Sequence, residues 1–412
     1  MKKISLFILL LVSLLRGQVD KYEQINFCKL YDNVLIVKSG EVYPDQIVAV
    51  KSEKGIVIID AGISPTLTSQ YRKIIENEFP DDKIEYAINT HHHFDHTNGN
   101  QVFADATIIA QENAAAGMKQ FAAEIPEFVK YRRTRYQRRD KLANTLDPSS
   151  TLHKKLKELV FMSSRMCDDL ESNFRLTLPN ITFTNRLEIN LGNMRVKLFY
   201  FPPEFHTDND IIAVIPELGL IFIGDILPEI DYTASITSRH DLGNAVNVLD
   251  EVIKTCGEIN HVITIHAGIL PSGNLISFRN KLLSMSAEKQ TKISAMNKSE
   301  EVADKNKLND ISVIARNLFN NNDYYLWEGD LLNLADKLFN NEKQQEGLAL
   351  FALNAELFTE SVDAYDWLGD AYFKIEQFER AKAAFEKALE IYPVDSFAAD
   401  MIYQIDTKLN GE

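Results

Sequence analysis

A dense histidine cluster constrains this chain more than any other feature of its sequence. The cluster follows residues 84–89, whose pattern predicts a buried strand, so it lies where the chain leaves a sheet. Because an apolar core offers few hydrogen-bond partners, burying several imidazoles with a carboxylate is costly unless a ligand satisfies them. The chain is therefore expected to hold metal at a strand end. The segment reads Thr90, His91, His92, His93, Phe94, Asp95 and His96.

The spacing His-x-His-x-Asp-His divides the cluster into two sets of ligands. In an extended loop, side chains two residues apart point the same way, so His91 and His93 can close on one cation. Asp95 and His96 then turn toward a second cation. Imidazole and carboxylate together suit zinc, and they also suit manganese or ferrous iron. A surface histidine cluster without a ligand is the alternative.

Strand and helix patterns alternate over most of the chain, which predicts an α/β fold. Runs rich in Val and Ile between turn residues predict short strands, and helical periodicity predicts a helix over 66–78. Residues 113–178 show helical periodicity without a strand signal, which predicts a helical insertion. The expected strands are 34–37, 47–50, 55–59, 84–89, 106–110, 181–183, 187–191, 194–201, 211–215, 220–223 and 262–265.

The C-terminal part of the chain carries a repeat with a period of about 34 residues. Its spacing matches a tetratricopeptide helix pair, and a looser copy stands one period earlier. We expect two helix pairs and a capping helix over 396–408, with an unrelated amphipathic helix bundle as the alternative. The positions that carry the match are Tyr365, Leu368, Gly369, Tyr372, Ala381, Phe385, Ala388 and Pro393.

A polar, lysine-rich stretch that begins near residue 286 separates the two parts of the chain. The expected organisation is a catalytic domain at 26–285, a linker or helix at 286–321 and an all-α repeat region at 322–412. Two helix pairs are fewer than the roughly three repeats that a free-standing solenoid needs. The repeats are therefore expected to bury their apolar faces against the catalytic domain or a second copy.

The N-terminus has the pattern of an export signal. Lys2 and Lys3 precede a run over 4–15 that is apolar apart from two serines, and this run is shorter than the roughly 18 residues that a membrane span needs. We expect residues 1–17 to be a signal peptide and the protein to be exported, either periplasmic or secreted. An uncleaved membrane anchor is the alternative.

Charge and cysteine content exclude several classes of protein. The chain has 44 basic and 59 acidic residues, a net charge of −15, and such a surface repels phosphate backbones. Nucleic acid is therefore not an expected partner. Cys28, Cys167 and Cys256 have no metal-type spacing and can form at most one disulfide.

The histidine cluster and four further segments together resemble the metallo-β-lactamase fold family. Each segment places a histidine or aspartate of the family pattern at the matching point, and the resemblance covers roughly residues 26–281. It implies an αββα sandwich, with Asp60 behind the ligands. The sequence departs from the family at Asn98, Phe205, Asn209 and Ile265, where glycine is usual. The four further segments are 56–62, 205–210, 220–225 and 262–268.

The resemblance implies a dinuclear zinc site with Asp95 and Asp225 as its catalytic carboxylates. Two cations about 3.5 to 4 Å apart share a hydroxide whose pKa falls toward about 7, and they polarise a substrate carbonyl. His92 is the variable position of the motif, and His153 lies on a predicted helix of the insertion. His240 and His261 are expected at surface or capping positions. The implied ligands are His91, His93 and His206 for one ion, Asp95, His96 and His266 for the other, and Asp225 as the bridge.

The resemblance implies a metal-dependent hydrolase. Its expected substrate is an ester, lactone, thioester or amide-type compound, and the fold itself does not choose among these classes. An aspartate at the bridging position resembles the glyoxalase-like and lactonase-like members. Efficient β-lactam turnover is not expected, since Ile226, Leu227 and Pro228 stand where lactamases carry a substrate-binding lysine. The alternatives are an iron-dependent redox enzyme of the same fold, or a binding protein whose repeats hold a partner and whose metal site is not catalytic.

A basic patch interrupts the acidic chain within the helical insertion. One interpretation is a solvated helix face that balances acidic neighbours. The other is a cap over the metal cleft that attracts an anionic substrate. The patch comprises Arg132, Arg133, Arg135, Arg138, Arg139 and Lys141, interleaved with Tyr131 and Tyr136.

Overall fold

The structure is a computed structural model of the chain. Several sequence-based expectations fall outside the described residues: the signal peptide at 1–17, the linker at 286–321 apart from its first residue, the start of the repeat region at 322–327, and the single residues Pro228, His240 and Pro393. The described residues are 25–40, 45–202, 205–227, 242–266, 268–286, 328–340, 343–392 and 395–410.

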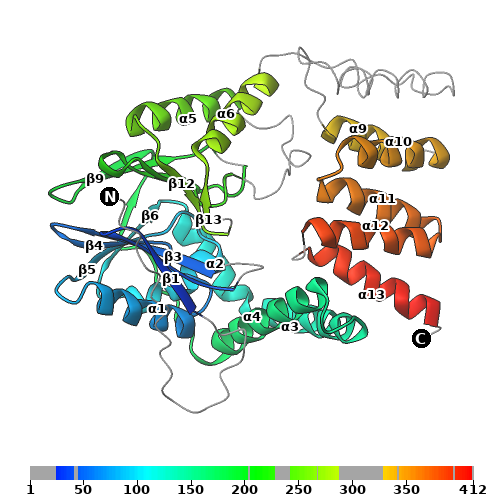
Figure 1. Cartoon of the computed structure of the whole chain (residues 1–412), viewed down its shortest axis with the longest axis horizontal. Helices are drawn as coiled ribbons and strands as arrows, with labels where there is room; N and C mark the ends of the chain where they lie inside the picture. The colour runs from blue at the N-terminus through cyan, green and yellow to red at the C-terminus, as the bar shows by residue number, and fades with distance from the viewer. Residues whose placement is uncertain are drawn as a thin grey trace, which may run out of the picture.

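The described strands form two β-sheets that lie face to face (Figure 1). In the first sheet the strands lie side by side in chain order, antiparallel from β1 to β4 and parallel from β4 to β7. These strands are β1 (Ile25–Tyr31), β2 (Val34–Ser39), β3 (Asp45–Ser52), β4 (Gly55–Ile59), β5 (Ile84–Ile88), β6 (Thr107–Gln111) and β7 (Ile181–Phe183).

The second sheet runs in the order β13-β12-β11-β10-β9-β8, and only β11 and β12 pair in parallel among its described strands. The parallel pairs matter for function, because parallel strands deliver their carboxyl ends to the same edge of a sheet. Its strands are β8 (Arg186–Asn190), β9 (Arg195–Tyr200), β10 (Ile211–Ile215), β11 (Leu220–Phe222), β12 (His261–Thr264) and β13 (Gly268–Leu270).

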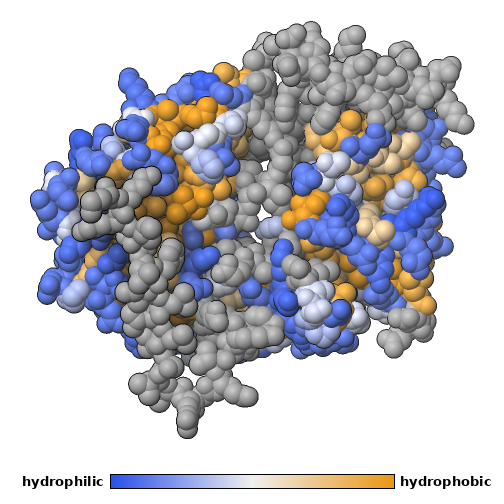
Figure 2. Space-filling view, in the orientation of Figure 1, coloured by the Kyte–Doolittle hydropathy of each residue, from blue (hydrophilic) through white to orange (hydrophobic). Residues whose placement is uncertain are grey.

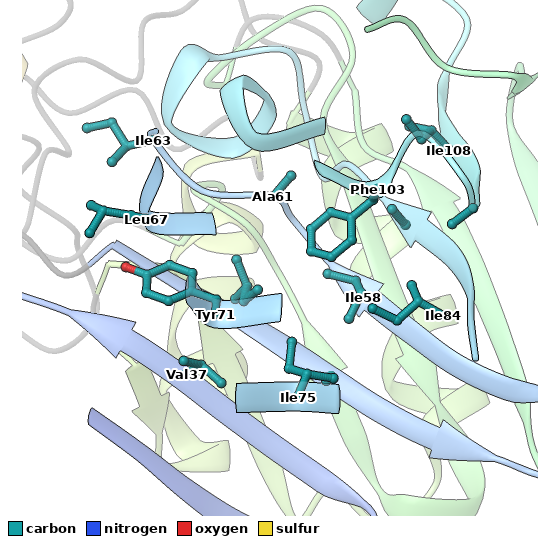
Figure 3. Close-up of a cluster of buried hydrophobic side chains, with 14 of the residues drawn as sticks. Val37, Ile58, Ala61, Ile63, Leu67, Tyr71, Ile75, Ile84, Phe103 and Ile108 are labelled. Atoms are coloured by element: carbon teal, nitrogen blue, oxygen red, sulfur yellow. The ribbon is translucent and has the colours of Figure 1, made fainter. Parts of the chain in front are cut away.

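Side chains of the strands alternate between two hydrophobic layers, as the period of two in a strand requires. In β2, Val34 and Ile36 pack between the sheets, whereas Leu35 and Val37 pack under a helix. Helix α1 (Pro65–Glu78) covers the first sheet; Figure 3 shows its buried side chains. Helices α5 (Leu242–Cys256) and α6 (Ser272–Ser286) cover the second. The αββα sandwich is thus confirmed.

The insertion consists of two packed helices, α3 (Ala114–Thr145) and α4 (Thr151–Ser172), which form an arm beside the sandwich (Figure 1). The buried carboxylate of Asp169 on α4 anchors the arm at the start of α1. It accepts hydrogen bonds from the Ser64 hydroxyl, the Thr66 hydroxyl at 2.6 Å and the Thr66 backbone N–H at 3.0 Å. The arm therefore supplies a hydrogen-bond acceptor for the N-terminus of α1, in addition to the Ser64 side chain, which accepts from the Leu67 backbone N–H at 3.4 Å.

The basic patch of the insertion is largely engaged within the molecule. Arg133 pairs with Asp168 and Glu171 of α4, at 2.9 and 2.5 Å. Arg135 and Arg138 reach Asp400 in the C-terminal helix, at 3.2 and 3.7 Å. The patch thus balances acidic neighbours as the first interpretation expects, but it does so at a contact between two parts of the chain.

The repeat region stacks its helices in antiparallel order beside the arm (Figure 1). Gly369 permits close packing of one helix pair, because a Cβ atom there would lie 2.8 Å from the Phe385 ring. The capping helix that the sequence predicts is present as α13. The described helices are α9 (Glu328–Asn340), α10 (Gln344–Leu357), α11 (Val362–Lys374), α12 (Phe378–Ile391) and α13 (Ser396–Asn410).

The arm covers part of the apolar surface of the repeats. This contact agrees with the expectation that the repeats bury apolar surface against the catalytic domain or a second copy. Leu142 and Leu156 of the arm share one buried cluster with Ile402 and Ile405 of α13. Figure 2 shows that hydrophobic surface also remains on the outer side of the repeat region. Among the described helices, none is both long enough and apolar enough to cross a membrane.

Replacing Ile402 with aspartate is expected to detach the repeats from the arm without loss of metal. Ile402 is 1% exposed, so the substitution places an unpaired charge in an apolar contact, which is costly. Limited proteolysis should then release the tail, while metal content stays that of the wild type, since none of the predicted ligands lies beyond His266. Leu409→Asp, at a position 47% exposed on the same helix, is the control. Loss of metal in the Ile402 variant alone would show that the tail helps to build the metal site.

Candidate metal centre

The structure brings all seven of the predicted ligand side chains to one edge of the sandwich. They come from loops and a short helix at the ends of strands in both sheets, although those strands are far apart in the sequence. His91 and His93 follow β5, and Asp95 and His96 lie on the short helix α2 (Phe94–Thr97). The remaining three are His206 before β10, Asp225 after β11 and His266 after β12.

Three imidazoles converge on one point of this edge. His206 Nε2 lies 3.2 Å from His91 Nε2 and 2.9 Å from His93 Nδ1. His91 is fully buried, whereas the His206 side chain is 27% exposed. Three ring nitrogens so close together suit a shared cation that each can ligate.

A second group of candidate ligands lies next to the first. His266 Nε2 is 3.2 Å from Asp95 Oδ2, and His96 belongs to the same group. Asp225 lies between the two groups, because its Oδ2 atom approaches ring nitrogens of both. The distances from Asp225 Oδ2 are 3.9 Å to His91, 3.6 Å to His206, 3.3 Å to His96 and 3.4 Å to His266, each at Nε2.

The donor atoms of this edge fit divalent metal ions. His96 is fully buried and its Nε2 atom makes no hydrogen bond, which is costly unless another ligand binds there. The candidate set contains imidazole nitrogens and carboxylate oxygens and no thiolate, a combination that suits zinc, manganese or iron.

The backbone of the histidine cluster is only partly the extended loop that the sequence predicts. His91 and His93 do point to the same side, but residues from Phe94 to Thr97 form a helical turn. The turn carries Asp95 and His96 on to the second group. Gly224, with φ of +55°, lets the Asp225 loop approach, because a Cβ atom there would lie 2.9 Å from Thr90.

Asp60 holds this arrangement from behind, as the resemblance implies. Its carboxylate accepts hydrogen bonds from the Thr90 backbone N–H at 2.7 Å and the Thr90 hydroxyl at 2.9 Å. It also lies 2.9 Å from His96 Nδ1, which donates to it and leaves Nε2 free to face the centre. Asp60 therefore fixes both the tautomer and the orientation of His96.

Asp60→Asn is expected to weaken metal binding at the His96 position by about 10- to 100-fold, the usual cost of losing such a partner. Asp60 has φ of +59°, a conformation that asparagine tolerates, so the backbone should stay in place. Competition with a chromophoric chelator measures the affinity, and circular dichroism checks the fold. Unchanged affinity would mean that His96 needs no carboxylate to orient it.

The pKa values of the histidines differ between the two ligand groups. Burial lowers the pKa of His93 to about 4, with the neighbouring His206 acting in the same direction. Burial also lowers the pKa of His91 well below its usual value. For His266, burial opposes protonation but the Asp225 and Asp95 carboxylates outweigh it and raise the pKa to about 10. For His96, burial likewise opposes protonation, but the Asp225, Asp60 and Asp95 carboxylates outweigh it and raise the pKa well above its usual value. The three-histidine group is therefore neutral at pH 7, whereas the histidines of the second group are protonated.

Sequence reasoning missed several residues that support the centre. Asn89 and Asn100 form a reciprocal amide pair, 2.9 Å in each direction, below the histidine cluster. Asp45 accepts hydrogen bonds from the Ile63 backbone N–H and the Tyr71 hydroxyl, each at 2.9 Å, and burial raises its pKa to about 6. No local pattern marks these residues, since each acts through a partner distant in the sequence.

The other histidines that the structure describes belong to neither ligand group. His153 Nδ1 is 2.8 Å from the Ala143 carbonyl near the end of α3, and the His261 ring lies 5.9 Å from the Tyr31 ring. His92 is half-buried and its Nδ1 atom lies 2.7 Å from Asn209 Nδ2. The cysteines Cys28, Cys167 and Cys256 are free thiols.

Comparisons with known proteins agree with this architecture. A sequence model of the metallo-beta-lactamase superfamily matches residues 42–251, and a tetratricopeptide repeat model matches residues 362–395. A metallo-beta-lactamase type 2 of Bacillus cereus is 22% identical over 246 residues, which cover 58% of this chain and 73% of that protein.

Solved structures resemble the chain more distantly. A metallo-beta-lactamase from Pontibacter korlensis has a TM-score of 0.42 at 16% identity, covering 63% of this chain and 99% of its own. A double mutant of the sec-alkyl sulfatase PisA1 has a TM-score of 0.48 at 12% identity, covering 93% of this chain and 65% of its own.

The superfamily model spans about half of the chain, and the sandwich carries His and Asp groups suited to metal at one edge. The chain belongs to the metallo-beta-lactamase superfamily and is a metal-dependent hydrolase of that fold, followed by a tetratricopeptide-type helical region.

Proposed function

We propose that the chain is a dinuclear zinc-dependent hydrolase that acts on an ester, lactone, thioester or amide-type substrate. The observation that carries this proposal is the position of Asp225 Oδ2, within 3.9 Å of ring nitrogens from both ligand groups. In this assignment one zinc ion is held by His91, His93 and His206, the other by Asp95, His96 and His266, and both by Asp225.

The side chains of the centre place a carboxylate between imidazoles and orient the ligands. When bound, a pair of zinc ions lowers the pKa of a shared water toward about 7 and polarises the oxygen of a substrate carbonyl. Asp225 supplies negative charge between two groups of imidazoles, and Asp60 keeps His96 oriented. Burial of His91 and His96 keeps bulk water away from the inner faces of their rings.

The chain needs no serine or cysteine nucleophile for this chemistry. Cys167 is buried, and burial raises the pKa of its thiol to about 11, so it stays protonated near neutrality. Burial also raises the pKa of the Cys256 thiol. Hydrolysis should therefore survive thiol alkylation of a metal-replete sample, and inactivation by alkylation would argue for a different mechanism.

Metal analysis followed by a substrate screen tests the proposal. About two zinc equivalents per chain are expected, because seven candidate ligands surround two positions and none of them is a thiolate that would favour a softer metal. The screen comprises nitrocefin, lactones, thioesters, sulfate esters and bis-nitrophenyl phosphate, before and after chelation. Hydrolysis that chelation abolishes and zinc restores supports the proposal. Iron without hydrolysis would instead favour a redox enzyme, and bound metal without any turnover would favour a binding protein.

The repeat region and the N-terminus support proposals about the binding partners and the localisation of the protein. Tetratricopeptide repeats are suited to protein contacts, so we propose a small-molecule substrate at the centre and a protein partner or second copy at the repeats. We also propose that the protein is exported, periplasmic or secreted, on the basis of the basic and apolar pattern over 1–17. Sequencing of the mature N-terminus tests this, since a retained Met1 would contradict cleavage.

A further inference from the structure

We propose that His92 is a positioning residue that ties the two ligand loops of the metal centre together through Asn209. The inference rests on the proposed metal centre, because its effect is exerted on His206. It assigns a role to a histidine that lies within the ligand motif but belongs to neither ligand group.

His92 points away from the ligand set that surrounds it in the sequence. Its neighbours His91 and His93 contribute nitrogens that lie 3.2 and 2.9 Å from His206 Nε2. In an extended segment the residue between them faces the opposite side. There, the Nδ1 atom of His92 lies 2.7 Å from the Asn209 amide nitrogen.

Asn209 is fully buried and stands three residues after His206. Its amide group uses both hydrogens, one toward Asp208 Oδ1 at 2.7 Å and one toward His92 Nδ1. His92 therefore accepts this hydrogen bond, which places its own ring proton on Nε2. A glycine at position 209, as the family usually carries, would have no side chain to make this bond.

The first turn of α3 closes the other side of the His92 ring. Gly117 lies so close that a Cβ atom there would fall 2.3 Å from His92 Cδ2. Asn113, immediately before α3, donates from its side chain to the Asp208 backbone carbonyl at 3.2 Å. The imidazole is thus held between the arm and the loop that carries His206.

His206 depends on such support more than the other members of its group. It is the one member of the three-histidine group that comes from a separate segment, and its side chain is 27% exposed whereas His91 is buried. The hydrogen bond from Asn209 to His92 therefore sets the distance between the His206 loop and the His91–His93 segment. Loss of this bond should weaken the three-histidine position and leave the Asp95–His96–His266 position nearly unchanged.

Cobalt titration of His92 variants tests the inference. His92→Phe keeps a ring of similar shape without the acceptor, and Asn209→Ala removes the same bond from the other side. Each is expected to lower the affinity of the three-histidine position by about 10-fold or more, as loss of an outer partner does. The Co²⁺ absorption spectrum follows each site, and competition with a chromophoric chelator gives the Zn²⁺ affinities. His92→Gln offers an amide oxygen as acceptor and should restore part of the loss.

A double substitution separates positioning from general damage to the fold. Gly117→Ala should weaken the same site by displacing the His92 ring. In a His92→Ala background, Gly117→Ala should add no further loss, because the ring that it would strike is gone. His261→Phe is the matched control and should bind both ions as the wild type does.

The outcomes distinguish the inference from the function on which it rests. If the wild type bound no metal, the proposed function would fall and the inference with it. If the wild type bound two ions and His92→Phe and Asn209→Ala bound them with unchanged affinities and spectra, only the inference would be overturned. Equal weakening of both sites would also overturn it, because such a result would indicate a general structural defect instead of a role in positioning His206.

Discussion

Replacing Asp225 with alanine is expected to lower turnover by about 10³-fold. The Asp225 carboxylate lies between the two ligand groups, and without it four imidazoles lose the negative charge that faces them. Metal ions supply several kcal/mol of transition-state stabilisation, and each 1.36 kcal/mol is tenfold in rate, so loss of the pair accounts for about three orders of magnitude. Metal analysis beside steady-state kinetics on the best substrate of the screen measures both consequences.

The matched control for this variant is Asp250→Ala. Asp250 forms an exposed pair with Arg279, 2.8 Å apart, between the helices that cover the second sheet. Such surface pairs contribute about 0 to 1 kcal/mol, so this variant should keep its metal and its activity. If Asp225→Ala also retained both metals at wild-type affinity and full activity, the assignment of Asp225 as the bridge would be wrong.

Much of the sandwich was predictable because its strands carry local signals. The strands β2, β3 and β4 contain short runs rich in Val and Ile between turn residues, and each buries side chains on both faces. The edge strand β1 escaped prediction, since only its ends are partly buried and Phe27 is 47% exposed. The helix α5 was not predicted either, although Ala245, Leu249 and Val252 lie at helical spacing on its buried face.

The candidate ligands were predictable because each stands in a motif or directly after a strand, where local sequence is informative. Their supports were not, since support comes from distant partners. Asp45 acts through Tyr71, and His92 acts through Asn209, more than a hundred residues further on. The ion pair of Arg135 was equally difficult to predict, because its partner Asp400 lies on the last described helix.

In the proposed dinuclear assignment, the two metal positions are expected to respond differently to pH. In the metal-free protein His266 has a pKa of about 10, so it is protonated at neutral pH, and a metal ion must displace that proton to bind. His93 has a pKa of about 4 and is already neutral above about pH 5. Proton competition therefore acts mainly on the position that contains His266.

The sign and size of the pH effect follow from proton competition. Below the pKa of a ligand, each displaced proton lowers the apparent metal affinity about tenfold per pH unit. Lowering the pH from 8 to 6 should thus weaken the His266 position by at least about 100-fold, while the three-histidine position changes by less than a few fold. The pKa of Asp95 adds nothing to this slope: burial opposes ionisation, but the charges of His96 and His266 hold the pKa well below its usual value, so the carboxylate stays ionised throughout. Zinc titration calorimetry in two buffers of different ionisation enthalpy counts the protons released at each step. Equal pH slopes at both positions would contradict the division into a neutral histidine group and a protonated carboxylate–histidine group.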